Sequence, residues 1–170
     1  MITRVFSRVS TFFSGNEKSE EELNPFQNPF TNKIVAYSKE IGWKFEVVSE
    51  STVRMLFEHD NGRTQLVLFS RQRSGNDTEV VSIHSPVIYL STLRNSGVDL
   101  KAFFNELLVL NAESSNYKWA FTPVSEEDEV LIASVDLLLD TMDLKEMGMA
   151  VSAVSAVADQ MEERFGVDEF

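Results

Sequence analysis

A long stripe of apolar residues near the C-terminus constrains the fold more than any other feature of the chain. Between positions 144 and 165, apolar residues alternate three and four positions apart: Leu144, Met147, Val151, Val154, Ala158, Met161 and Phe165. A period of about 3.5 residues is typical of a helix that packs against another surface along its whole length. The stripe therefore predicts one long helix from about Asp143 to Phe165.

Two different surfaces could bury this stripe. The helix could lie across the sheet of its own chain, or it could contact a second subunit or a partner protein. In the second case the partner or dimer face consists of Leu144, Met147, Val151, Val154, Ala158 and Met161. Small residues run beside the stripe at Ala150, Ala153 and Val157, and they allow another backbone to approach closely. The sequence leaves both alternatives open.

Upstream of this helix, the chain begins its folded part with a shorter helix. Asn28 can cap the free amides, Pro29 fits the first helical position, and Gly42 is well placed to end the helix. One face of this segment is apolar, with Phe30, Ile34, Tyr37 and Ile41. Residues 43–48 then alternate between apolar and polar side chains, which predicts a strand.

The next segments predict more strands and a second helix. Two strands in residues 52–72 are joined around Asn61-Gly62, a dipeptide that favours a type I′ hairpin turn. A turn at 74–77 leads to a further strand. Asp99 then caps a helix whose predicted buried face is Leu100, Phe103, Phe104, Leu107 and Leu108.

Residues 110–121, LNAESSNYKWAF, contain a polar run from Asn111 to Asn116 that we interpret as a connection from helix to strand. The strand that follows places Tyr117, Trp119 and Phe121 on one face. Four adjacent acidic residues at 126–129 predict a solvated hairpin turn before a last strand. Asp136 interrupts this apolar strand, and we expect it on the exposed face or at a strand edge, because a buried carboxylate needs a partner.

Together these elements predict an α+β protein, a two-layer sandwich with an antiparallel sheet of five to six strands. The expected order is helix, three to four strands, helix, β-hairpin and long C-terminal helix. Residues 28–170 form the predicted domain, and residues 1–27 form an N-terminal arm with an acidic linker.

The arm has an amphipathic pattern of its own. Its apolar residues recur at helical spacing, and Arg4 and Arg8 lie opposite the predicted docking face, Val5, Phe6, Val9, Phe12 and Phe13. Such a segment can pack on its own domain, dock on a partner, lie on an anionic membrane surface, or remain disordered.

Composition excludes several classes of function. The net charge of −12 makes nucleic acid an unexpected partner, since phosphate binding needs clustered Lys and Arg. Without cysteine there is no disulfide, thiolate nucleophile or cysteine metal ligand. The two histidines, His59 and His84, are separated without a ligand pattern, and the common nucleotide and hydrolase motifs are absent. We therefore expect no catalytic, cofactor or metal site, and the chain is not predicted to be an enzyme.

Three stretches of the second half resemble the YbjN family and the wider class of type III secretion chaperone-like domains. They are LLVLNAESSNYKWAF, EEDEVLIASVDLLLD and the final helix KEMGMAVSAVSAVADQMEERF. The resemblance spans residues 28–166 and omits the arm. It implies a two-layer α+β sandwich, often dimeric, that binds protein or peptide and carries no catalytic residues.

The leading functional hypothesis is a cytoplasmic, non-enzymatic protein- or peptide-binding module, chaperone-like or regulatory, with a homodimer as a possible form. Extended peptides could be recruited at a sheet edge or in apolar grooves between helix and sheet. The alternative is a peripheral membrane-associated protein that uses the basic amphipathic arm.

Overall fold

A six-stranded antiparallel sheet organises the fold. The structure is a computed structural model, and it describes residues 24–59, 62–75, 78–167 and 170. The strands follow the order β1-β2-β3-β4-β6-β5, and each neighbouring pair is antiparallel. They are β1 (Glu46–Ser49), β2 (Thr52–Glu58), β3 (Thr64–Ser74), β4 (Thr78–Tyr89), β5 (Lys118–Pro123) and β6 (Glu129–Leu138). The predicted fold class is confirmed.

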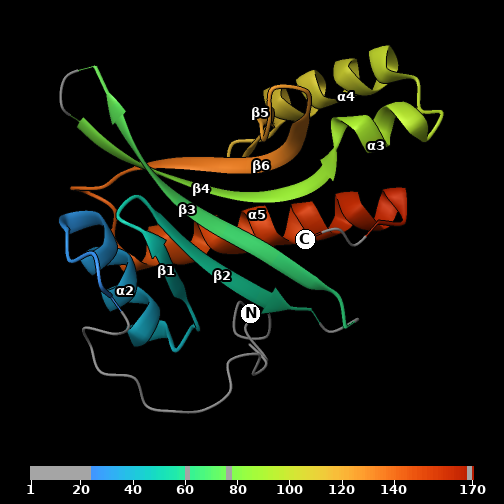
Figure 1. The fold of residues 1–170 in the computed structure, drawn as a ribbon. Helices are drawn as coiled ribbons and strands as arrows, with labels where there is room; N and C mark the ends of the chain where they lie inside the picture. The colour runs from blue at the N-terminus through green and yellow to red at the C-terminus, as the bar shows by residue number, and fades with distance from the viewer. Residues whose placement is uncertain (1–23, 60–61, 76–77, 168–169) are drawn as a thin grey trace.

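Four helices complete the described part of the chain (Figure 1). They are α2 (Pro29–Ile41), α3 (Leu90–Asn95), α4 (Leu100–Glu113) and α5 (Leu144–Phe165). The sequence predicted α2, α4 and α5 with these boundaries to within a residue or two. It did not predict α3, a short helix between β4 and α4.

Local capping determines where the helices begin and end. The Asn28 side chain accepts a hydrogen bond from the Thr31 amide at 3.0 Å, and the Thr31 hydroxyl accepts one from the Asn28 amide. Asp143 and Glu146 form the same reciprocal pair at the start of α5. Gly42 ends α2 with φ +83°, a left-handed conformation that favours glycine. Asp143 therefore caps the last helix.

The apolar stripe of α5 packs on the chain's own sheet. In Figure 1, α5 runs behind β2 and β3 and crosses the sheet, with α2 beside it. The stripe residues Met147, Val151, Val154, Ala158 and Met161 are at most 6% exposed. They share one core with sheet residues such as Val67, Phe69, Ile83 and Ala133. Of the two alternatives that the sequence left open, the structure shows the packing within the chain.

A buried polar cluster ties the C-terminal end of α5 to the β2–β3 hairpin. Arg63 donates from Nε to Asp159 at 2.7 Å, and from Nη2 to Glu162 and to the Val167 carbonyl, both at 2.9 Å. Glu162 is fully buried, and Gln65 also donates to it at 3.4 Å. Because a buried carboxylate is costly without partners, Arg63 compensates a charge that the core could not otherwise hold.

The β2–β3 hairpin differs from the predicted turn type. The His59 amide donates to the Arg63 carbonyl at 2.8 Å, and the Gly62 amide donates to the His59 carbonyl at 2.9 Å. The closing pair therefore encloses three residues rather than two. With Gly62 at φ +80°, this is a three-residue loop with a glycine bulge. The hairpin prediction is confirmed, and the type I′ assignment is wrong because the strand register places one more residue in the loop.

We expect Val154→Asp to destabilise the fold by several kcal/mol, because it places an unpaired charge at a fully buried position of α5. Chemical denaturation measures the change in the free energy of unfolding. Met149→Asp is the matched control on the same helix, since Met149 is 60% exposed, and it should change stability by less than about 0.5 kcal/mol. Equal stability of the two variants would show that the buried face of α5 is misplaced.

Arg63→Met should cost about 3–5 kcal/mol, because it leaves the buried Glu162 carboxylate without its cation. Arg73→Met is the control, since the Arg73 side chain is 71% exposed and its nearest carboxylate oxygen lies 3.9 Å away. Urea unfolding of both variants at neutral pH compares them. If Arg63→Met loses no more stability than Arg73→Met, the cluster does not hold α5 in place.

Candidate protein-binding surfaces

The residues predicted as a site lie in two places. The predicted partner or dimer face on α5 is covered by the chain's own sheet, with Leu144 half-buried and the other five side chains in the core. A contact of this face with a second subunit stays a prediction that the structure does not test. The predicted N-terminal docking face, Val5, Phe6, Val9, Phe12 and Phe13, lies outside the described residues.

Helix α4 exposes three large apolar side chains that the sequence did not assign to a surface. Leu108 is 66% exposed, Val109 55% and Phe104 38%, and we call these three residues the α4 ridge. The predicted buried face included Phe104 and Leu108, and this is wrong. The rest of that face is confirmed, since Phe103 and Leu107 are buried and Leu100 is half-buried, so the buried side of the helix is narrower than expected.

Contacts with α5 explain which side of α4 is buried. Arg164 donates from Nη1 and Nη2 to the two carboxylate oxygens of Glu106, at 2.5 and 2.9 Å. The hydrogen bond from Arg164 lowers the pKa of Glu106, and the Glu106 carboxylate raises the pKa of Arg164. Phe103 lies edge-on to Phe165, with ring centroids 5.4 Å apart. These contacts fix the inner side of α4. On the α4 ridge, Phe104 packs edge-on against Phe121 of β5, with ring centroids 5.5 Å apart, while Leu108 and Val109 face solvent.

The edge strand β5 is closed by a side chain from α4. Asn111 donates from Nδ2 to the Trp119 carbonyl at 2.9 Å, and the Trp119 amide donates to Asn111 Oδ1 at 2.6 Å. The side-chain amide of Asn111 thus makes the two hydrogen bonds to Trp119 that a neighbouring strand would make. Pro123 ends the strand without an N–H group. Together they leave little free backbone for another strand to pair with.

The polar run at 111–116 is therefore more than a connection. Lys118 donates from Nζ to the carbonyls of Asn111 and Ser114, at 2.5 and 2.6 Å, and so satisfies the end of α4. The pattern of Asn after an apolar helix and before an aromatic strand was visible in the sequence. Its role was not, because it depends on the helix and the strand edge lying side by side.

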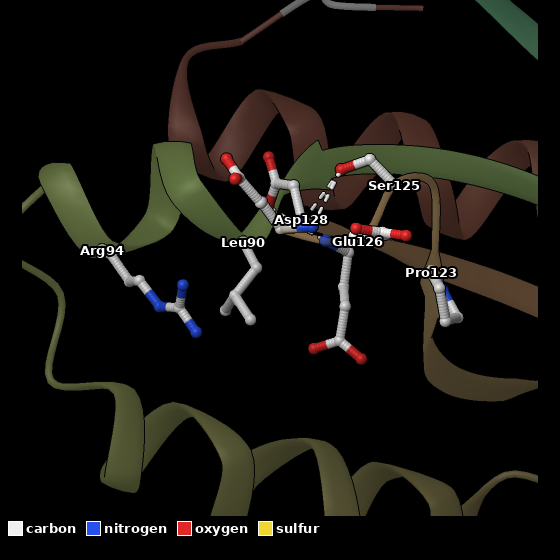
Figure 2. A pocket seen from close by; sticks show the side chains of 8 residues that line it. Leu90, Arg94, Pro123, Ser125, Glu126 and Asp128 are labelled. Carbon is white, nitrogen blue, oxygen red and sulfur yellow. Dashed lines mark hydrogen bonds between the residues drawn. The ribbon is translucent and has the colours of Figure 1, made fainter.

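A small hollow lies beside the acidic β5–β6 hairpin (Figure 2). It measures about 240 Å³ and is lined by α3 residues Leu90 and Arg94 on one side and by hairpin residues on the other. Asp128 accepts hydrogen bonds from the Ser91 amide and hydroxyl, at 3.1 and 2.5 Å, and these bonds lower its pKa. The Ser125 hydroxyl accepts from the Asp128 amide. The acids thus form a turn joined to α3, and across the described ranges no group of three or more acidic or histidine side chains is arranged to hold a metal.

The second face of the sheet carries no described helix in front of β2 and β3 (Figure 1). Strand register aligns Arg54, Leu68, His84 and Ser134 across four strands on this face, with Leu56 and Leu66 in the adjoining row. We call this surface the open sheet face. Its leucines are half-buried.

Two titratable residues, His84 and Asp136, lie on this face. Burial lowers the pKa of His84, while a hydrogen bond with the Ser82 backbone and, less strongly, the charge of Asp136 raise it. His84 Nδ1 is buried without a hydrogen-bond partner. Asp136 is exposed, as predicted, opposite Ser82. The structure therefore keeps the carboxylate in solvent and the imidazole largely out of it.

Comparison with known proteins gives a fold likeness. No protein-family model and no curated protein sequence matches the chain. The structure is similar to the crystal structure of YbjN, a candidate transcription regulator from E. coli, with a TM-score of 0.50 and 12% sequence identity. The match covers 80% of this chain and 91% of that chain. This confirms the expected resemblance at the level of the fold. In the described part of the chain, no helix is long and apolar enough to cross a membrane.

We expect Asn111→Ala to destabilise the chain by about 1–3 kcal/mol, because it leaves the Trp119 amide and carbonyl without partners. It should also promote association through the freed edge of β5. Asn95→Ala, at an exposed position on α3, is the control and should leave both properties unchanged. Thermal unfolding and light scattering report the two effects. A stable Asn111→Ala variant that associates no further than the unchanged chain would contradict the assigned role.

Proposed function

We propose that this chain is a non-enzymatic protein-binding module, chaperone-like or regulatory, that works as a two-fold dimer through α4. The observation that carries the proposal is the α4 ridge, three large apolar side chains exposed on a helix whose inner side is held in place. Contiguous exposed apolar surface is typical of an interaction site. The likeness to the fold of YbjN, a candidate transcription regulator, supports the regulatory form of the hypothesis.

Charges at the two ends of α4 favour a second copy of the chain as the partner that covers the α4 ridge. Lys101 and Glu113 are exposed near the first and last positions of the helix, with the ridge between them. In an antiparallel pair of α4 helices, Lys101 of each copy faces Glu113 of the other. A two-fold interface brings the same patch of both copies together, so this arrangement satisfies both pairs at once.

The overall charge explains why the contact is confined to this helix. Two copies that each carry a net charge of −12 repel one another over most of their surface. The α4 ridge is apolar and is bounded by one positive and one negative side chain. A helix of 14 residues is about 21 Å long, so the contact is small and we expect the dimer to dissociate on dilution.

A further polypeptide would be recognised by side chains rather than by strand addition at β5. Asn111 and Pro123 occupy that edge, so the main-chain groups that a peptide strand needs are largely used or absent. Recognition by apolar side chains is consistent with the chaperone-like form of the hypothesis.

Leu108→Asp should convert the dimer to a monomer without loss of folding, because Leu108 is exposed and the substitution sets two carboxylates against each other at the two-fold contact. Size-exclusion chromatography with light scattering, run at several concentrations on the full chain, measures the mass. Met149→Asp is the control, an equally exposed apolar residue on α5, and should remain dimeric. A wild-type chain that is monomeric at every concentration would contradict the proposed dimer.

Charge reversal tests the antiparallel pairing itself. Lys101→Glu and Glu113→Lys should each weaken the dimer, and an equimolar mixture of the two variants should restore it, because each variant then supplies the charge that the other needs. Lys145→Glu, an exposed reversal on α5, serves as the control. A mixture no more dimeric than its components would rule out this orientation of the helices.

A further inference from the structure

We infer that the open sheet face is the docking site for the N-terminal segment of the same chain, residues 1–13. This surface is separate from the α4 ridge, and the inference does not depend on the proposed dimer. It rests on the chemistry of the face, on the place where the described chain begins, and on the charge of the segment.

The face offers an apolar surface with unsatisfied polar atoms beside it. Leu56, Leu66 and Leu68 lie in neighbouring register positions of β2 and β3. Glu58 continues the same face of β2, and its Oε2 is buried without a hydrogen-bond partner. His84 lies opposite Leu68 in the β3–β4 pair, and its Nδ1 is also buried without a hydrogen-bond partner. Such atoms cost free energy unless a partner is supplied, so this face favours a cover that brings apolar side chains together with donors.

The described chain begins at the β1 edge of the sheet, from which either face can be reached. Asn24 donates to Asn32 of α2 at 2.8 Å, and Asn28 donates to the Glu50 carbonyl in the β1–β2 turn at 2.9 Å. The chain therefore enters the domain at the β1 edge of the sheet, and the leucines lie on the next two strands. The α4 ridge is at the opposite edge, about 24 Å across a sheet with strands about 4.8 Å apart. Ten residues, 14–23, span at most about 33–36 Å, which is enough to pass around the β1 edge, and the leucines of β2 and β3 are the apolar surface nearer to that edge.

The charge of the segment complements the domain. Residues 1–13 contain Arg4 and Arg8 and no acidic residue, whereas the whole chain has a net charge of −12. The face carries Glu58 beside Leu56 on β2, and the exposed Asp136 lies on the same face of β6, with β4 between it and the leucines. Val5, Phe6, Val9, Phe12 and Phe13 supply the apolar side chains, and the arginines supply donors for carboxylates. A membrane surface would attract the same two arginines, but it would not satisfy the polar atoms of the face.

The absence of cysteine makes a direct test possible on the full chain. Ser10→Cys introduces a single thiol for a nitroxide spin label, and amide NMR signals near the label lose intensity. We expect loss of most of the signal at Leu56, Leu66 and Leu68, and none at Met149 on α5. Phe6→Asp combined with Phe12→Asp should restore the signals, whereas Ser7→Asn on the polar side should leave the loss unchanged.

Three results would overturn the inference. The first is full signal intensity across β2 and β3 in the labelled chain. The second is signal loss in an unlabelled, isotope-enriched chain mixed with a labelled one, which would assign the segment to a neighbouring copy. The third is full signal intensity together with flotation of the chain on vesicles containing anionic lipid, which would assign the segment to a membrane surface. Loss within one chain that survives added vesicles supports the docking.

Discussion

The packing of α5 across the sheet is the contact on which the rest of the structure depends. One helix covers parts of β3, β4 and β6, strands that come from both halves of the chain, and it closes the core with a single regular stripe. At its far end, the buried Glu162 requires Arg63 from the β2–β3 hairpin, so the position of the helix along the sheet is specified as well as its face. Burial of apolar side chains thus stabilises the fold, and the Arg63–Glu162 ion pair specifies where α5 lies along the sheet.

The surfaces follow from this arrangement. Because α5 and α2 occupy one face of the sheet, the other face is left without a described helix, and because Arg164 at the end of α5 holds Glu106, α4 turns its ridge outward. Asn111 closes the edge beside that ridge. At the β5 edge the chain therefore presents apolar side chains while restricting main-chain pairing, a combination that separates specific binding from aggregation.

Local patterns predicted most of the fold, since covalent geometry determines them. The caps at Asn28 and Asp143, the stripe of α5 and the alternation of the strands depend on residues close in sequence, and each appears in the structure. The exposure of Phe104 and Leu108 could not be predicted, because the ion pair that holds α4 joins Glu106 to Arg164 from another helix. Both sides of α4 carry leucine and phenylalanine, so composition alone did not identify the inner one. The role of Asn111 and the extra loop residue at Gly62 likewise depend on which strands meet.

The strand order has a consequence for the synthesis of the chain. β4 is paired on one side with β3, which precedes it, and on the other with β6, which begins only at Glu129. While the ribosome adds residues at about 5–20 per second, β4 is an unprotected edge until β6 has emerged. The core face of the first four strands waits longer still, because α5 is the last element to be made. A nascent chain of this topology thus exposes an unpaired strand edge and apolar core surface for most of its translation. General chaperones would bind these surfaces before any specific partner does.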